Sequence, residues 1–172
     1  RDSLRGSVFN NTERGYASGM GGHTGTISDC FMGAATWCKS PAQTVNYASC
    51  HDNMSLFDRL TLSNPEASTE DLIRYNNLAA AIYMTAQGVP FFQAGEEMLR
   101  SKPLGNGEFD HNSYCSPDSV NSLKWNDLNK GAYQDVYRYY QGLIAFRKAH
   151  PALRMTEAEE VSAHICKLTG LD

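Results

Sequence analysis

The chain has 172 residues, a formal net charge of −4 at pH 7 and 41% hydrophobic residues. That length suffices for one ordinary domain, and nine Tyr, seven Phe and two Trp exclude a generally disordered chain. Basic residues number 15 against 19 acids, which argues against a nucleic-acid-binding module. No stretch approaches the roughly 20 apolar residues that span a bilayer. The composition predicts a mildly acidic globular protein with neither nucleic acid nor membrane as a partner.

The five cysteines are an odd number, contain no CxxC pair and lie at positions 30, 38, 50, 115 and 166. This usage favours free thiols in a reducing compartment, so we expect a cytoplasmic protein, with secretion left open. The chain begins with Arg1 and shows no signal-like apolar run. We therefore expect a fragment of a longer protein.

The first forty residues are rich in glycine and predict loops around at most one short helix. Regular order is expected from Thr44 onward, where residues 44–49 favour a strand that stops at the polar cluster 51–53. Ser68, followed three residues later by Asp71, predicts a helix N-terminus.

The helix that follows Ser68 is predicted to end at Gly88, and its apolar residues are Leu72, Tyr75, Ala79, Ile82 and Ala86. Residues 88–95 predict a second strand, with Pro90 at its start or on its non-bonded side. A strand, helix and strand at this spacing predict a parallel pair.

A polar, turn-rich loop is expected over 99–131, and a second helix over 132–149, before Pro151. The apolar residues on one face of this second helix are Tyr133, Val136, Tyr137, Tyr140, Leu143 and Ile144. Arg147 and Lys148 are expected to complement the dipole of this second helix. In parallel α/β folds, ligands bind at the carboxyl ends of the strands. The segments 51–53 and 96–97 both fall there, which makes them the candidate site.

Asp52 is the first candidate, because a carboxylate at a strand end can orient a substrate or transfer protons; capping the loop backbone is the alternative. The adjacent His51 invites a metal site, but the other histidines lack ligand-like spacing, so no metal or other cofactor is predicted. Glu96 and Glu97 are expected to be loop acids paired with Arg100 or Lys102. A carboxylate pair between one of them and Asp52 stays open.

The loop 106–114 reads NGEFDHNSY and combines amide and carboxylate groups with aromatic neighbours. Sugar sites have this composition, because hydroxyls need planar polar partners and sugar faces stack on rings. A solvated turn has a similar composition, so this loop alone does not decide the ligand.

Several segments resemble one enzyme family. Residues 45–53 read VNYASCHDN and resemble the fourth signature region of the α-amylase superfamily, at the end of the seventh barrel strand. Residues 88–102, GVPFFQAGEEMLRSK, resemble the eighth strand of type I pullulanases, and 112–121, NSYCSPDSVN, the loop after it. Residues 1–9, RDSLRGSVF, resemble the segment after the sixth strand.

The resemblance implies an α/β fold: the C-terminal part of a (β/α)8 TIM-type barrel, about strands 7 and 8 with their helices. Residues 1–151 would be partial catalytic barrel, and 152–172 the first strand of a C-terminal β-sandwich domain. The implied activity is retaining hydrolysis of α-1,6-glucosidic branch linkages in pullulan, starch or glycogen, so the implied partner is an α-glucan. No oligomeric state is implied.

By the same resemblance, Asp52 would be the catalytic transition-state stabiliser, and His51 and Asn53 would bind substrate, with Asn112 and Tyr114 as weaker substrate contacts. Retention needs a carboxylate nucleophile and an acid/base. No stretch here matches the family motif of either group, so we expect this fragment alone to be inactive. Two alternatives stay open: an isoamylase or glycogen-debranching type of α-1,6-glucosidase, and a non-catalytic α-glucan-binding barrel.

Overall fold

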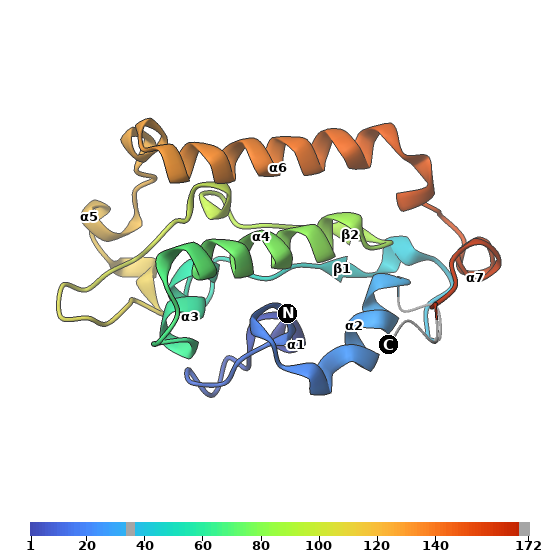
Figure 1. Ribbon diagram of the computed structural model, residues 1–172, viewed down its shortest axis with the longest axis horizontal. Coiled ribbons are helices and arrows are strands. Elements are labelled where there is room, and N and C mark those ends of the chain that lie inside the picture. The colour runs from blue at the N-terminus through green and yellow to red at the C-terminus, as the bar shows by residue number, and fades with distance from the viewer. Residues whose placement is uncertain (34–36, 169–172) are drawn as a thin grey trace.

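The computed structural model describes residues 1–33 and 37–168. Its strands are β1 (Val45–Asn46) and β2 (Val89–Pro90). Its α-helices are α1 (Asp2–Arg5), α2 (Thr24–Phe31), α3 (Leu56–Ser63), α4 (Thr69–Thr85), α5 (Asp118–Asn121), α6 (Gly131–Ala149) and α7 (Ala158–His164). Figure 1 shows α6 lengthwise along one side of the molecule, with α4 and the strand pair next to it and α2 on the opposite side. The chain is thus mixed helix and sheet, as expected.

The two strands pair in parallel, with Val45 opposite Val89. This confirms the parallel pair that the order strand, helix, strand predicts. Both strands are shorter than the predicted ranges, 44–49 and 88–95. A strand is recognised by its ladder of hydrogen bonds, and within the described residues each strand has only the other as a neighbour.

Pro90 occupies a position where its missing N–H costs no ladder bond. The amides on either side of it, those of Val89 and Phe91, donate to the carbonyls of Thr44 and Asn46 at 3.0 and 2.9 Å. In a parallel ladder the residue between two such donors turns its own N–H away from the partner strand. Pro90 is therefore on the non-bonded side, as predicted.

Helix α4 begins where the sequence predicts. The Ser68 hydroxyl accepts a hydrogen bond from the Asp71 amide at 3.1 Å, which satisfies one of the free N–H groups of the first turn. After the helix, Gly88 has φ +90°, a left-handed conformation, and a Cβ there would collide with the Thr44 hydroxyl. Glycine is needed at this turn for both reasons.

The Arg147 side chain caps the neighbouring helix α4. Its Nη1 donates to the carbonyls of Met84 and Ala86 at 2.9 and 2.7 Å, and its Nη2 to that of Gly88 at 2.7 Å. These carbonyls lie in the last turn of α4 and just beyond it, where helices leave acceptors without partners. Arg147 lies in the last turn of α6, as predicted. Its side chain in addition reaches across the contact between the two helices.

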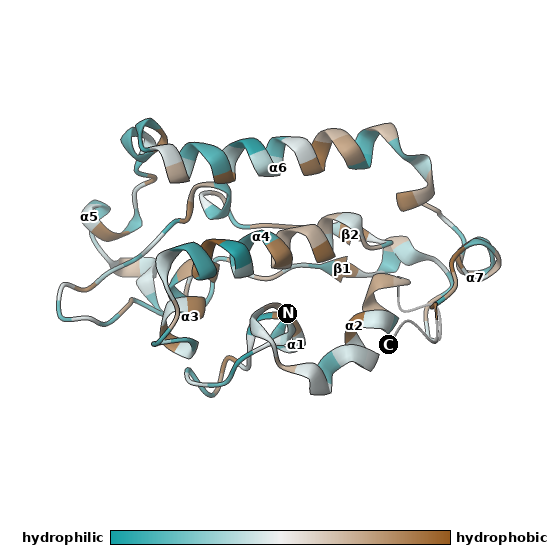
Figure 2. Cartoon of the chain, in the orientation of Figure 1, coloured by the Kyte–Doolittle hydropathy of each residue, from teal (hydrophilic) through white to brown (hydrophobic). Residues whose placement is uncertain are grey.

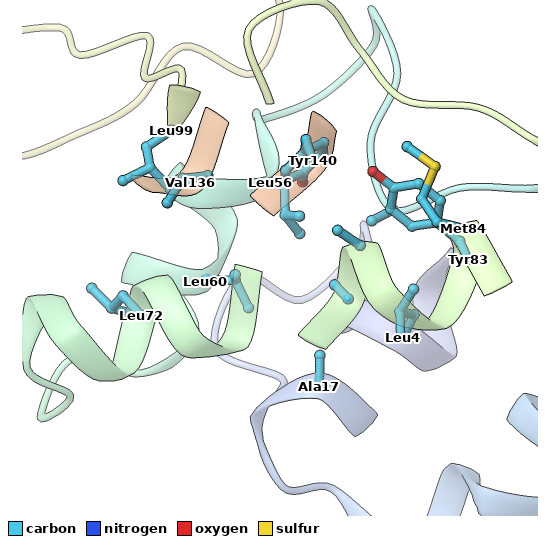
Figure 3. Close-up of a cluster of buried hydrophobic side chains, with 13 residues drawn as sticks. Leu4, Ala17, Leu56, Leu60, Leu72, Tyr83, Met84, Leu99, Val136 and Tyr140 are labelled. Carbon is cyan, nitrogen blue, oxygen red and sulfur yellow. The ribbon is translucent and has the colours of Figure 1, made fainter. Parts of the chain in front are cut away.

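The core lies between α3, α4 and α6. Figure 3 shows side chains from these helices pointing toward a common centre, and Figure 2 shows hydrophobic residues gathered in the C-terminal half of α4. Its buried members are Leu4, Ala17, Ala48, Leu56, Leu60, Leu72, Ala79, Ala80, Tyr83, Met84, Leu99, Val136 and Tyr140. Four of them, Leu72, Ala79, Val136 and Tyr140, were predicted from helical spacing, whereas Tyr83 and Met84 were not.

Several elements differ from the predictions. The first forty residues contain two α-helical segments, α1 and α2, although α1 is a single turn. Helix α3 was not predicted, although Ser55 accepts from the Asp58 amide as a regular N-cap. Helix α7 lies where the first strand of a β domain was expected, and the described residues after 152 contain no strand. The division of the chain at residue 151 stays a prediction.

The described part of the chain contains no disulfide. Cys38 is buried and donates to the Gly33 carbonyl at 3.1 Å. The cysteine usage predicts thiols and no disulfide framework. The expected cytoplasmic location stays a prediction. No helix among the described residues is long and apolar enough to cross a membrane.

Candidate functional site

The loops after β1 and β2 meet at one end of the strand pair, as a parallel arrangement requires. Ser49, three residues after β1, donates a hydrogen bond to Glu96 in the segment after β2. Both side chains are buried. This bond joins two loop segments that lie 47 positions apart in the sequence.

His51 and Asp52 follow Ser49 and extend into solvent. Their side chains are 87% and 73% exposed, and His51 Nε2 lies 3.5 Å from Asp52 Oδ2. Among the described residues, the Asp52 carboxylate accepts no backbone N–H, so it does not cap the loop. An exposed carboxylate beside an imidazole is free to accept hydrogen bonds from the hydroxyls of a ligand.

Lys102 links the two segments that carry the predicted site residues. Its Nζ donates to the Asn53 carbonyl at 2.9 Å and to the Ser113 hydroxyl at 3.1 Å. Ser113 stands between Asn112 and Tyr114, whose side chains are exposed. The structure therefore brings these residues to the same region as Asn53, and their binding roles stay predictions.

The opening segment of the chain packs against the same corner. Arg5 is buried and donates to the Met54 carbonyl at 3.0 Å. Burial, together with repulsion from Arg1 and Arg59, lowers the pKa of Arg5 to about 10. A pocket beside Asn53 is lined by Arg5, Val8, Phe9, Asn11, Asn53, Met54, Arg59 and His111. The segments that were singled out by resemblance thus converge around residues 51–54.

Glu96 is fully buried and is not the loop acid that the sequence predicts. One carboxylate oxygen accepts from the hydroxyls of Tyr83 and Tyr140 at 2.5 and 2.9 Å, and the other accepts from Ser49. Burial raises the pKa of Glu96, although the three hydroxyl donors act in the opposite direction. These donors enclose the Glu96 carboxylate. Glu96 therefore holds the loop after β1 through Ser49 and does not face a ligand.

Glu97 also differs from the prediction. Its carboxylate accepts from the Gly95 amide at 2.8 Å. Within the described residues neither Glu96 nor Glu97 forms an ion pair, so the expected pairs with Arg100 or Lys102 are wrong. Glu97 is bonded instead to the backbone of its own turn, and Glu96 is bonded to three hydroxyl groups.

As possible metal ligands, His51 and Asp52 form an isolated pair. Among residues 1–33 and 37–168, no three His, Cys, Asp or Glu side chains gather where they could hold a metal ion. A metal site of the usual kind needs three or four such ligands.

Sequence reasoning missed the residues that support the site from within. Tyr140 was predicted only as an apolar helix position, Lys102 only as a possible ion-pair partner of Glu96 or Glu97, and Tyr83 was given no role. A usable signal exists for the tyrosines, because a buried Tyr hydroxyl usually needs a hydrogen-bond partner. Asp58, whose pKa is raised by burial, accepts from the Lys102 amide at 2.8 Å and was also missed.

Comparison with known proteins agrees with the resemblance, although no family model matches the chain. The pullulanase of Bacillus subtilis strain 168 is 34% identical over 175 residues, which cover 98% of this chain and 23% of that protein.

Solved structures give the same result. A pullulanase from Bacillus acidopullulyticus matches with a TM-score of 0.88 and 38% identity, over 94% of this chain and 19% of that one. The pullulanase from Paenibacillus barengoltzii, solved in complex with maltohexaose and α-cyclodextrin, matches with a TM-score of 0.87 and 40% identity, over 95% of this chain and 25% of that one. The chain spans about a fifth to a quarter of the length of these relatives. Because sequence and structure agree over nearly its whole length, the chain belongs to the pullulanase family.

Proposed function

We propose that this chain carries part of the active site of a retaining glycoside hydrolase that cleaves α-1,6-glucosidic linkages in pullulan, starch or glycogen. The observation that carries the proposal is the exposed His51–Asp52 pair at the carboxyl end of β1. Membership of the pullulanase family supports the reaction, and the maltohexaose in one related structure supports an α-glucan as the ligand.

In this proposal β1 and β2 are about the seventh and eighth strands of a (β/α)8 barrel, and α4 is the helix between them. Their parallel pairing supports the placement. So does the exposure of Val45 and Val89, which are 56% and 45% exposed although they belong to a strand pair. Strands of a parallel barrel are normally covered on both faces and at both edges.

Asp52 would accept hydrogen bonds from hydroxyls of the sugar at the cleaved bond, and it would favour the distorted ring of the oxocarbenium-like transition state. His51 would bind the same sugar, and Asn53 a neighbouring one. A retaining reaction also needs a nucleophile and an acid/base about 5–5.5 Å apart. The family motifs of those two groups are not among the residues of this chain, so both would come from the remainder of the protein.

The test is hydrolysis of pullulan by the full-length protein that contains this chain, comparing wild type with Asp52→Asn and measuring released maltotriose. Loss of an interaction made in the transition state should lower kcat by about a thousandfold or more, with the fold intact. The matched control is Asp135→Asn, at an exposed position of α6, which should leave kcat unchanged. Near-normal turnover of Asp52→Asn would contradict the proposed role.

The same assay separates the alternatives. A protein that releases branches from glycogen but not maltotriose from pullulan would be a debranching enzyme of the isoamylase or glycogen-debranching type. A protein that binds maltohexaose without turnover of either polymer would be a non-catalytic α-glucan-binding barrel.

A further inference from the structure

Lys102 is a buried lysine with an unusual set of partners. Its side chain is 1% exposed, and its ammonium donates to a backbone carbonyl, that of Asn53, and to the hydroxyl of Ser113. Within the described residues the ammonium forms no ion pair. A buried charge without a carboxylate partner is costly, so a lysine at this position needs a reason beyond stability.

The backbone of Lys102 is also fixed on both sides. Its amide donates to the buried Asp58 carboxylate at 2.8 Å, and its carbonyl accepts from the Asp110 amide at 2.8 Å. Asp58 belongs to α3, so the anchor of Lys102 is a helix and not a loop. The backbone that carries the Lys102 side chain is therefore held in place where the ammonium reaches Asn53.

The carbonyl that Lys102 holds belongs to a residue with a left-handed backbone. Asn53 has φ +67°, a conformation that is uncommon outside glycine and that asparagine adopts more readily than most other residues. Such conformations persist only where the surroundings determine them, and they cluster at functional sites. A charge-assisted hydrogen bond to the Asn53 carbonyl fixes the direction of that peptide, and the Asp52 carboxylate is attached one residue earlier.

We propose that Lys102 is a positioning residue for Asp52: it holds the left-handed Asn53 peptide so that the exposed carboxylate meets the sugar in the productive orientation. This inference rests on the proposed function. The Lys102 ammonium is enclosed between Asn53 and Ser113, so in this proposal it acts on the sugar only through Asp52. Burial and repulsion from Arg100 lower the pKa of Lys102, in keeping with its enclosed position.

Lys102→Met tests this in the full-length protein, because methionine keeps most of the volume and removes the donor. Misplacing a transition-state group by about 1 Å lowers turnover by about a hundredfold, so we expect kcat on pullulan to fall by about 10- to 100-fold. KM should change by less than about threefold, since the lost orientation matters most in the transition state. Lys148→Met, an exposed lysine on α6, is the matched control and should leave both values unchanged.

A double-mutant cycle with Asp52→Asn separates positioning from a general structural role. If Lys102 acts through Asp52, Lys102→Met should lower kcat by less than about threefold in the Asp52→Asn background. Losses that multiply in the double variant would overturn the proposal, and so would unchanged turnover in Lys102→Met alone. Near-normal turnover in Asp52→Asn alone would instead contradict the proposed function.

Ser113→Ala keeps the inference testable if Lys102→Met does not fold. This variant leaves Lys102 in place but removes the second partner that orients its ammonium. We expect a smaller loss of kcat, about two- to tenfold, that also vanishes in the Asp52→Asn background. A loss that persists in that background, or no loss at all, counts against the positioning role.

Discussion

Glu96 is a carboxyl group held in the core by three hydroxyl donors, from Ser49, Tyr83 and Tyr140. These donors come from the loop after β1, from α4 and from α6, so this single side chain ties three elements together beneath the candidate site. Satisfied polar groups of this kind specify one arrangement of the core, whereas a partly satisfied group would destabilise it. The Ser49 bond is the one that connects Glu96 to the His51–Asp52 corner.

Replacement of Glu96 by glutamine should have a pH-dependent effect on stability. Because burial raises the pKa of Glu96 in the folded state, its contribution to stability is fully present below the pKa of the unfolded chain and is lost as pH rises through the folded-state pKa. Glutamine stays neutral and can still accept from the tyrosines. The melting temperature of Glu96→Gln relative to wild type should therefore increase from pH 4.5 to pH 8.

The measurement is thermal unfolding of the full-length protein at several pH values, with Glu66→Gln, at an exposed position before α4, as the control. The control should differ from wild type by the same amount at every pH. A Glu96→Gln difference that is constant with pH, or that falls as pH rises, would show that Glu96 is not destabilised as an anion.

At the scale of elements, α4 and α6 are joined by polar bonds at their C-terminal ends as well as by apolar packing. Arg147 of α6 donates to three carbonyls at the end of α4 and at Gly88, immediately before β2. The guanidinium therefore fixes the angle at which the chain leaves α4 and enters the strand. Burial lowers the pKa of Arg147, but the group remains cationic throughout the physiological range.

Arg147→Met should destabilise the protein by about 2–4 kcal/mol, because buried carbonyls lose a charged donor and are left without partners. Hydrogen exchange should accelerate most in the last turn of α4 and at Val89. Arg138→Met, at an exposed position of the same helix, is the matched control and should cost less than about 0.5 kcal/mol. Equal stability of the two variants would mean that water replaces the Arg147 bonds.

The elements that the sequence predicted well are those with local signals. Ser68 and the helical spacing of apolar residues located α4, and Pro151 located the end of α6. The strand pair was predicted in order and direction but not in length, because ladder bonds depend on neighbours that lie elsewhere in the sequence. The hydrogen-bond partners of Glu96 and Arg147 could not be predicted, since no local pattern states which tertiary contacts a long side chain will reach.

At the scale of the whole molecule, Asp52 and His51 were predicted as site residues from their position at a strand end and from a resemblance. The structure puts both side chains in solvent beside each other. Lys102, Ser113 and Asp58 were not recognised as parts of the same corner. Their link depends on the loop after residue 99 folding back on α3, which a reading of one segment at a time does not show. The exposed part of this candidate site is thus easier to predict than the buried part that supports it.

The proposed barrel makes a prediction about the strand pair as a whole. An isolated pair of two-residue strands is a weak unit, and Val45 and Val89 are about half exposed on it. If further strands cover them in the full-length protein, Val45→Ser should destabilise that protein by about 1–3 kcal/mol, the cost of losing buried apolar area. In the separate 172-residue chain the same substitution should cost less than about 0.5 kcal/mol, because the side chain is already in water.

The comparison requires melting curves of four proteins, wild type and Val45→Ser in each context, together with pullulan hydrolysis. The separate chain should melt at a lower temperature than the full-length protein and should release no maltotriose, because it carries Asp52 without a nucleophile or an acid/base. Leu60→Ala is a useful reference, because Leu60 is fully buried in the chain itself and its truncation should cost about 2–5 kcal/mol in both contexts. Equal costs of Val45→Ser in the two contexts would mean that no neighbouring strand covers β1, and the barrel placement would then be wrong even if the full-length protein cleaves pullulan.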